Sequence, residues 1–135
     1  LIMPKFSKTS VPHAFPMRYV GTLINRNKLI KAISAEGIMV GKGYSKPMHL
    51  NQMFVRRIAY GSDHYPWSQS KVTYCKGDFP IAESLVDNEF IWIYQIAAPN
   101  TVDDMKDIVK AFNKVFSNLD SVNKAITNET LRYKW

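Results

Sequence analysis

The most regular pattern of apolar positions in the chain lies between residues 101 and 119. Thr101 stands before it as an N-cap residue, and Asp104 follows three positions later in a capping-box-like arrangement. The spacing predicts a helix that packs on a sheet, and we assign this helix no chemistry. The residues of its apolar face are Met105, Ile108, Val109, Phe112, Val115, Phe116 and Leu119.

A second helical pattern runs from Asn25 to Glu36. Asn25 is a preferred N-cap type, and Gly37 stands where a left-handed C-terminal cap is common. We expect the apolar stripe to face the core, and it consists of Leu29, Ile30 and Ile33. We expect the cations off this stripe to be solvated, and these are Arg26, Lys28 and Lys31.

Three segments have the composition of β-strands. Residues 14–20 alternate apolar and polar positions, and Pro16 cannot donate a ladder hydrogen bond, so we expect an edge strand there. Residues 38–44 form a second candidate, and residues 90–95, with apolar residues on both faces, form the third. Alternation of these strands with helices predicts an α+β fold, in which helices pack on one face of a small sheet.

The stretch 43–54 alternates polar groups with apolar anchors. Its polar candidates are Tyr44, Lys46 and His49, and Pro47 favours a turn among them. We predict a loop that is pinned to a core while its polar side faces a ligand or another domain. The apolar anchors are Met48, Leu50, Met53 and Phe54.

The following residues are less regular. We expect a short helix over 52–60 with Arg56 and Arg57 outward, no regular element over 61–74, and a short helix that opens near Pro80. The residues expected to point inward from the first of these helices are Met53, Val55, Ile58 and Ala59.

Charge is distributed unevenly along the chain. The net charge of the 135 residues is +7, but residues 1–60 hold ten lysines and arginines against one acidic residue. A basic half of this kind suits nucleic acid, the phosphate groups of a small ligand, or an acidic partner, and an ordinary solvated face has the same composition. The chain does not begin with Met, and we expect it to be an excised piece of a longer polypeptide.

Candidate catalytic chemistry is sparse. The three histidines have no metal-ligand spacing, and no glycine-rich phosphate-binding motif is present. Cys75 is the single cysteine, which excludes an intrachain disulfide and favours a reducing compartment; we expect it to be a small apolar filler. Carboxylates such as Asp87 and Glu89 are expected to be solvated.

Three separated pieces of the chain resemble one family, in the same order. Gly37-Ile38 followed by Tyr44-x-x-Pro47-x-His49-Leu50 resembles the "GI…Y-x-P-L-H" stretch of the DegT/StrS-type pyridoxal-phosphate-dependent sugar aminotransferases. Phe79-Pro80-Ile81-Ala82-Glu83 resembles the "P-x-A-E" helix start of that family, and Thr101 to Val115 resembles its acidic-capped closing helix. His13 to Tyr19, with Arg18, and Arg26-x-x-Leu29 fit the strand and helix opening of the same region.

Residues 1–11 have no periodicity, and we expect a linker or tail there; the pattern fades after Asp120, and we expect a weak helix or tail over 120–135. The resemblance implies that residues 12–119 form a C-terminal small domain with a small, mainly antiparallel sheet. In the family, the large domain holds pyridoxal phosphate and the catalytic lysine. The resemblance therefore implies that no residue of this chain is catalytic or binds the cofactor, and that the isolated chain is inactive.

The resemblance also implies the partners. These are the N-terminal cofactor-binding domain of the same polypeptide, a second subunit of a homodimer, and a phosphate-bearing keto sugar, which the family resemblance implies to be nucleotide-linked. The resemblance further implies that the sugar receives its amino group from glutamate or glutamine, and that the enzyme is cytoplasmic. Tyr44 and His49 match the segment that covers the substrate, and Lys46 and Arg18 are the candidates for its phosphates.

Two departures leave the substrate open. Residues 94–99 read Tyr-Gln-Ile-Ala-Ala-Pro where the family has "L-P-L-Y-P", and Phe79 stands where many members have Cys. A cyclitol or an amino-aromatic precursor is the alternative substrate.

Two other functions are compatible with the residues. One is a non-catalytic binding or regulatory module of the same fold, and the other is a basic nucleic-acid-binding domain that uses interleaved cations and aromatic residues.

Overall fold

The computed structural model describes residues 1–126, which fall into two compact units. The first unit comprises Leu1–Gly43 together with the described residues from Asn88 onward, and the second unit is Tyr44–Asp87. Of the weak helix or tail expected over 120–135, residues 127–135 lie outside the described part. The domain boundaries expected from the sequence stay a prediction.

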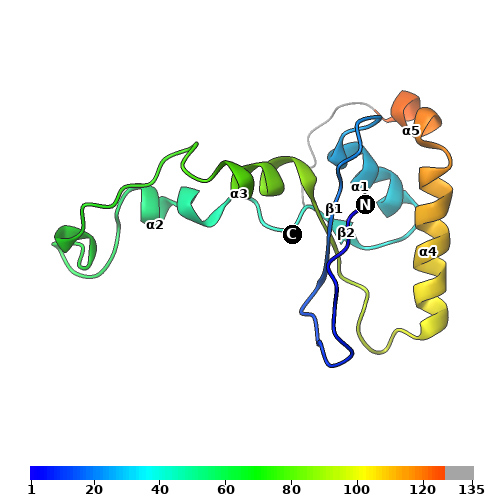
Figure 1. Ribbon diagram of the computed structural model, residues 1–135, viewed down its shortest axis with the longest axis horizontal. Coiled ribbons are helices and arrows are strands. Elements are labelled where there is room, and N and C mark those ends of the chain that lie inside the picture. Colours follow the sequence, from blue (N-terminus) through cyan, green and yellow to red (C-terminus); the bar gives the residue numbers. More distant parts are fainter. Residues whose placement is uncertain (127–135) are drawn as a thin grey trace. The chain divides into compact units, whose positions relative to one another are not determined.

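A three-stranded antiparallel sheet forms the centre of the first unit (Figure 1). Its strands are β1 (Phe15–Arg18), β2 (Val40–Gly41) and β3 (Phe90–Ile93), in the order β1-β3-β2. Strand β1 lies at the edge among the named strands, as Pro16 predicts, and the backbone of Ile2 pairs with Arg18 beside it. The α+β fold is thereby confirmed, although the second strand is shorter than expected.

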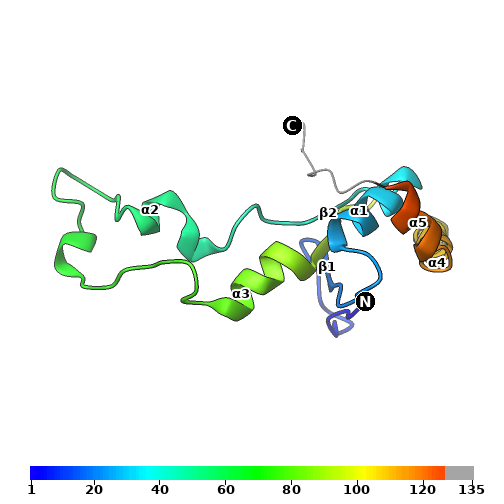
Figure 2. The ribbon, with the colours of Figure 1, turned by 90° about the horizontal axis from the view of Figure 1, so that it is seen from above.

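The helices of this unit lie on one side of the sheet (Figures 1 and 2). They are α1 (Arg26–Ala35), α4 (Val102–Phe116) and α5 (Leu119–Ala125). The predicted caps are confirmed, because the side chain of Asn25 accepts from the backbone N–H of Lys28, and Thr101 and Asp104 form a capping box.

The core lies between these helices and the facing side of the sheet. Leu29, Ile30 and Ile33 of α1 are almost fully buried, as the stripe predicts, and Ile91 of the central strand is fully buried with them. The apolar face of α4 is narrower than expected, because Val109 is 58% exposed. The remaining core residues are Met17, Tyr19, Ile24, Ala32, Val40, Ile93, Phe112 and Val115.

The prediction that Arg26 is solvated is wrong. Its residue is only 5% exposed, and its guanidinium donates to the backbone carbonyl of Phe90 and to the side-chain oxygen of Asn27. A buried guanidinium needs such acceptors, and the start of β3 supplies one of them. Helical periodicity carries no information about an acceptor that lies 64 residues away in sequence.

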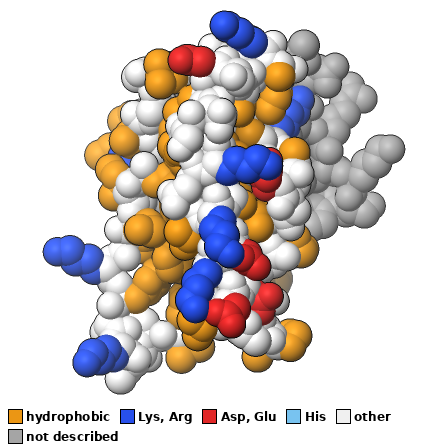
Figure 3. Space-filling view, turned by 90° about the vertical axis from the view of Figure 1, so that its right-hand side faces the viewer, with side chains coloured by type: hydrophobic (Ala, Val, Ile, Leu, Met, Phe, Trp, Pro, Cys, Tyr) orange, Lys and Arg blue, Asp and Glu red, His pale blue; other side chains and the backbone are white. Residues whose placement is uncertain are grey.

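The outer face of α4 is polar, and Figure 3 shows basic and acidic side chains gathered along it. Three exposed ion pairs with distances of 2.7 Å account for its lysines: Lys106–Asp103, Lys110–Asp107 and Lys114–Glu36. Exposed pairs of this kind contribute at most about 1 kcal/mol each. This face is therefore a solvated surface.

The second unit consists of short helical turns joined by irregular segments (Figure 2). The helix expected over 52–60 extends only from Gln52 to Val55, and three of its expected inward residues, Met53, Val55 and Ile58, are between 44% and 52% exposed. The short helix with Pro80 in its first turn is confirmed. The elements are η1 (Met48–Leu50), α2 (Gln52–Val55), η2 (Trp67–Gln69) and α3 (Pro80–Ser84). The turn η3 (Leu85–Glu89) begins in this unit and ends in the first.

None of the helices within residues 1–126 is both long and apolar enough to cross a bilayer.

Stability of the first unit should depend on the α1 stripe. Leu29→Ala should lower the free energy of unfolding by about 2–5 kcal/mol, because it removes a fully buried side chain and leaves a cavity. Leu23→Ala is the matched control: Leu23 is 62% exposed, and its loss should change stability by about 0.5 kcal/mol or less. Urea unfolding followed by far-ultraviolet circular dichroism measures both, and equal effects would contradict the assigned core.

Candidate functional site

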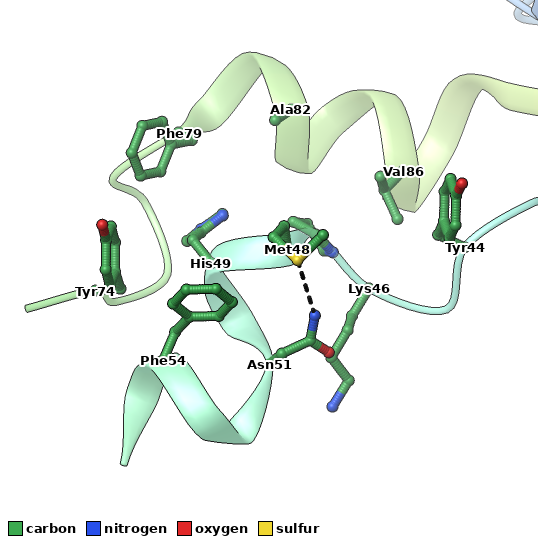
Figure 4. Close-up of a pocket in the computed structure, with 11 residues that line it drawn as sticks. Tyr44, Lys46, Met48, His49, Asn51, Phe54, Tyr74, Phe79, Ala82 and Val86 are labelled. Atoms are coloured by element: carbon green, nitrogen blue, oxygen red, sulfur yellow. Dashed lines mark hydrogen bonds between the residues drawn. The ribbon is translucent and has the colours of Figure 1, made fainter. Parts of the chain in front are cut away.

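A cavity of about 560 Å³ lies within the second unit (Figure 4). This volume falls within the range of small-molecule sites, which is roughly 300–1,000 Å³. Every residue that lines it belongs to Tyr44–Asp87, so the cavity does not depend on the first unit. The lining residues are Tyr44, Lys46, Pro47, Met48, His49, Asn51, Phe54, Tyr74, Phe79, Ala82 and Val86.

Three of the four site residues expected from the sequence line this one cavity. Tyr44 is 65% exposed, whereas His49 is 8% exposed, and Figure 4 shows the Lys46 side chain extending beside Asn51 on the side away from α3. Cation, phenol and imidazole therefore come to the same cavity, and the mostly apolar lining around them is typical of ligand sites.

Arg18, the fourth expected residue, is not among them. It belongs to β1 in the first unit, where its guanidinium donates two hydrogen bonds of 2.6 and 2.9 Å to the Glu89 carboxylate. The expectation that Glu89 is simply solvated is wrong, since its side chain is 20% exposed and holds this ion pair. The Arg18 side chain itself remains 51% exposed.

His49 is anchored by Glu83. The Nε2 atom of His49 lies 3.0 Å from the Oε1 atom of Glu83, and both side chains are at least nine-tenths buried. The same carboxylate accepts from the backbone N–H groups of Gly77, at 2.8 and 3.1 Å, and Phe79, at 3.4 Å. Glu83 thus joins turn η1, which carries His49, to the loop before α3.

These contacts favour the charged form of Glu83. The backbone N–H of Gly77 holds the pKa of the Glu83 carboxyl below its usual value, the hydrogen bond to His49 acts in the same direction, and burial acts against both. Glu83 is then a carboxylate, which accepts hydrogen bonds but does not donate them, so His49 must donate from Nε2. When the imidazole is neutral, Nδ1 is therefore the nitrogen that can accept a hydrogen bond.

Aromatic rings form one wall of the cavity. The ring of Phe54 meets that of Tyr74 edge-on with centroids 5.8 Å apart, and the rings of Tyr74 and Phe79 are 6.3 Å apart. Phe79 in turn contacts the imidazole of His49 at 4.8 Å. Trp67 does not line the cavity but packs edge-on against Phe54 and Tyr74 from behind. The wall offers an aromatic, apolar surface next to the buried imidazole.

The interpretation of Cys75 as an apolar filler is wrong. Its side chain is exposed, and its thiol donates to a carboxylate oxygen of Asp78 at 3.1 Å. This hydrogen bond and the charge of Asp78 raise the pKa of the Cys75 thiol, so the nucleophilic thiolate is disfavoured. Within residues 1–126 no group of three or more His, Cys, Asp or Glu side chains could hold a metal ion.

Sequence comparison points to aminotransferases. A stretch of 107 residues is 27% identical to a Streptomyces kanamyceticus protein named as an L-glutamine:3-amino-2,3-dideoxy-scyllo-inosose aminotransferase, and it covers 76% of this chain. A protein of the same name from Micromonospora echinospora is 27% identical over 108 residues, with the same coverage. The chain spans about a quarter of the length of these curated relatives, since the match covers 25% of each.

No family model matches the sequence. No solved structure matches it either. The two relatives thus support an aminotransferase-related domain, and the match covers one part of each relative.

The Glu83 network should make the second unit sensitive to acid. Because the folded-state pKa of Glu83 lies below its unfolded value, its contribution is present above the unfolded pKa and disappears as the pH falls through the folded pKa. Glu83→Gln should therefore lower the melting temperature at neutral pH and lose this deficit in acid. Thermal melts followed by near-ultraviolet circular dichroism across the acid range measure the difference.

Asp63→Asn is the control for this experiment, because Asp63 is an exposed carboxylate of the same unit. The pKa of Asp78 is also lowered, by hydrogen bonds from the backbone N–H and then the thiol of Cys75. Because Asp78 is present in both variants, its titration cancels from the comparison. A deficit of Glu83→Gln that is independent of pH would contradict the role of the charged carboxylate.

Proposed function

We propose that this chain is the C-terminal small domain of a DegT/StrS-type, pyridoxal-phosphate-dependent aminotransferase, and that its second unit covers the substrate. The observation that carries the proposal is the match of 107 residues to a quarter of the length of named aminotransferases. The matching motifs around His49, Glu83 and the α4 cap support it, because all three have defined structural roles here.

The cofactor would belong to the rest of such a protein. Pyridoxal phosphate needs a lysine for its carbonyl and an acidic or arginine partner for its ring nitrogen. The cavity lining includes a single lysine, Lys46, and neither an acidic residue nor an arginine. The cavity therefore does not fit this cofactor, and the lysine and the proton transfers are assigned to the large domain, with a homodimer as the proposed assembly.

The cavity has groups that suit a polyhydroxylated or phosphate-bearing ring. The ammonium of Lys46 can bind a phosphate or hydroxyl oxygen, and Tyr44 and the Nδ1 atom of His49 add hydrogen-bonding groups. The aromatic wall of Phe54, Tyr74 and Phe79 can pack on the apolar face of a ring. Arg18, which lies half-exposed in the first unit and pairs with Glu89, is kept as a separate proposal for a phosphate contact.

The names of the relatives sharpen the substrate class. Both specify L-glutamine and a scyllo-inosose derivative, so we propose L-glutamine as amino donor and a keto sugar or an inosose-type ring as acceptor. Binding of nucleic acid has less support, because Arg26 and Arg57 of the basic half are engaged by backbone carbonyls.

The reading frame upstream of Leu1 tests the family assignment. The proposal expects a domain with a cofactor-binding lysine there, and the purified full-length protein should show the visible absorption of bound pyridoxal phosphate. A frame without such a domain would contradict the proposal. A domain whose lysine is replaced would favour the non-catalytic module instead.

Substrate contact by Lys46 can be tested in that full-length protein with L-glutamine and scyllo-inosose. Lys46→Met should raise KM for the keto substrate on the order of tenfold, the effect of losing a hydrogen bond from a charged group, while cofactor absorption is retained. Lys71→Met, at an exposed position of the same unit that does not line the cavity, should leave KM unchanged. Equal effects of the two substitutions would remove Lys46 from the site.

A further inference from the structure

The segment from Ile58 to Thr73 has almost no regular structure. It nevertheless contains Trp67, whose ring packs against Phe54 and Tyr74 of the cavity wall. Its one helical turn is η2, and its large apolar side chains are mostly exposed, with Tyr60 82% and Tyr65 52% exposed. A hydrophobic core of its own therefore does not hold this segment in place. Apart from the ring contacts of Trp67 with Phe54 and Tyr74, its conformation depends on polar contacts.

Arg57 supplies these contacts. Its guanidinium donates from Nη1 to the backbone carbonyl of Val72 and from Nη2 to the carbonyls of Ser70 and Trp67. The distances to Val72 and Ser70 are both 2.5 Å. Three carbonyls from residues 10 to 15 positions later in the chain thus converge on one planar, permanently charged group, for which arginine is suited and lysine is not.

The backbone conformation of Arg57 is a second, independent observation that its side chain has a structural role. It has φ 54°, in the left-handed region, directly after Arg56, the C-cap of α2. Glycine is the usual residue at such a position, because a Cβ atom is strained there. An arginine at this position has a strained backbone, and such a conformation persists only where surrounding contacts stabilise it.

The three carbonyl contacts determine where Trp67 lies. Trp67 is the residue whose carbonyl binds the guanidinium, and its indole N–H donates to the carbonyl of Ile58 at 3.3 Å. Its ring meets Phe54 and Tyr74, at centroid distances of 5.8 and 6.4 Å, and these two rings line the cavity.

We propose that Arg57 is the positioning residue of the cavity wall: its guanidinium gathers the carbonyls of Trp67, Ser70 and Val72 and thereby holds Trp67 behind Phe54 and Tyr74. The role deepens the proposed function and rests on it for the identity of the ring that packs on the wall. The positioning itself concerns only this chain.

The test is the set of nuclear Overhauser contacts of the Trp67 ring with the Phe54 and Tyr74 rings in the isolated chain. Arg57→Gly relieves the backbone strain but removes the guanidinium, and Arg57→Lys keeps the charge without the planar donors. Both should lose the contacts. The matched control is Arg56→Lys at the neighbouring exposed position, which should keep them. Persistence of the contacts in Arg57→Gly would overturn the proposal.

Two further measurements separate positioning from general unfolding. The contact between His49 and Phe79, which rests on Glu83 and not on Arg57, should persist in Arg57→Gly. Added methylguanidinium should restore the Trp67 contacts in Arg57→Gly, whereas methylammonium should not. Equal restoration by the two cations, or loss of the His49–Phe79 contact together with the others, would overturn the specific role.

The full-length protein distinguishes this proposal from the function on which it rests. Arg57→Gly should raise KM for scyllo-inosose several-fold while cofactor absorption is retained. If the ring contacts depend on Arg57 but the full-length protein transfers no amino group, the positioning role stands and the proposed function fails. If the full-length protein transfers the amino group, and Arg57→Gly changes neither the ring contacts nor KM, the positioning role fails.

Discussion

The carboxylate of Glu83 is the interaction on which the second unit depends. It accepts hydrogen bonds from the imidazole of His49 and from the backbone of Gly77 and Phe79, and so ties together segments that lie 34 residues apart in sequence. Few apolar side chains of this unit are buried, so a network of polar contacts stabilises it, whereas a hydrophobic core stabilises the first unit.

The two units therefore have different physical bases. The first is held by Leu29, Ile33 and Ile91, whose burial follows from the helical and strand periodicity of the chain. The second is held by Glu83 and Arg57, each of which gathers several polar partners around one charged group. Such an arrangement leaves aromatic side chains free to line a cavity, where a close-packed core would have enclosed them.

This difference explains what could be predicted from the sequence. Periodicity is a local signal, and it correctly predicted α1, α4 with its cap, and the central strand β3. It failed where a side chain depends on a distant acceptor, as at Arg26, and where the expected 52–60 helix had no core to pack on.

The candidate site follows the same division. Tyr44, Lys46 and His49 could be predicted as neighbours because they lie within six residues of one another. The sequence could not predict that His49 pairs with Glu83 or that Tyr74 lines the cavity, because local sequence patterns do not encode contacts across the intervening loop. A glutamate in the first turn after Pro80, where it can accept from preceding N–H groups, was the available signal.

The central claim is that the second unit covers a keto substrate in a longer aminotransferase. Hydrogen–deuterium exchange of the full-length protein, with and without scyllo-inosose, tests it most directly. The account predicts that the substrate slows exchange in residues 44–54 and 74–86 and leaves the α1 and α4 helices of the first unit unchanged. Identical exchange of residues 44–54 and 74–86 with and without the substrate would contradict it.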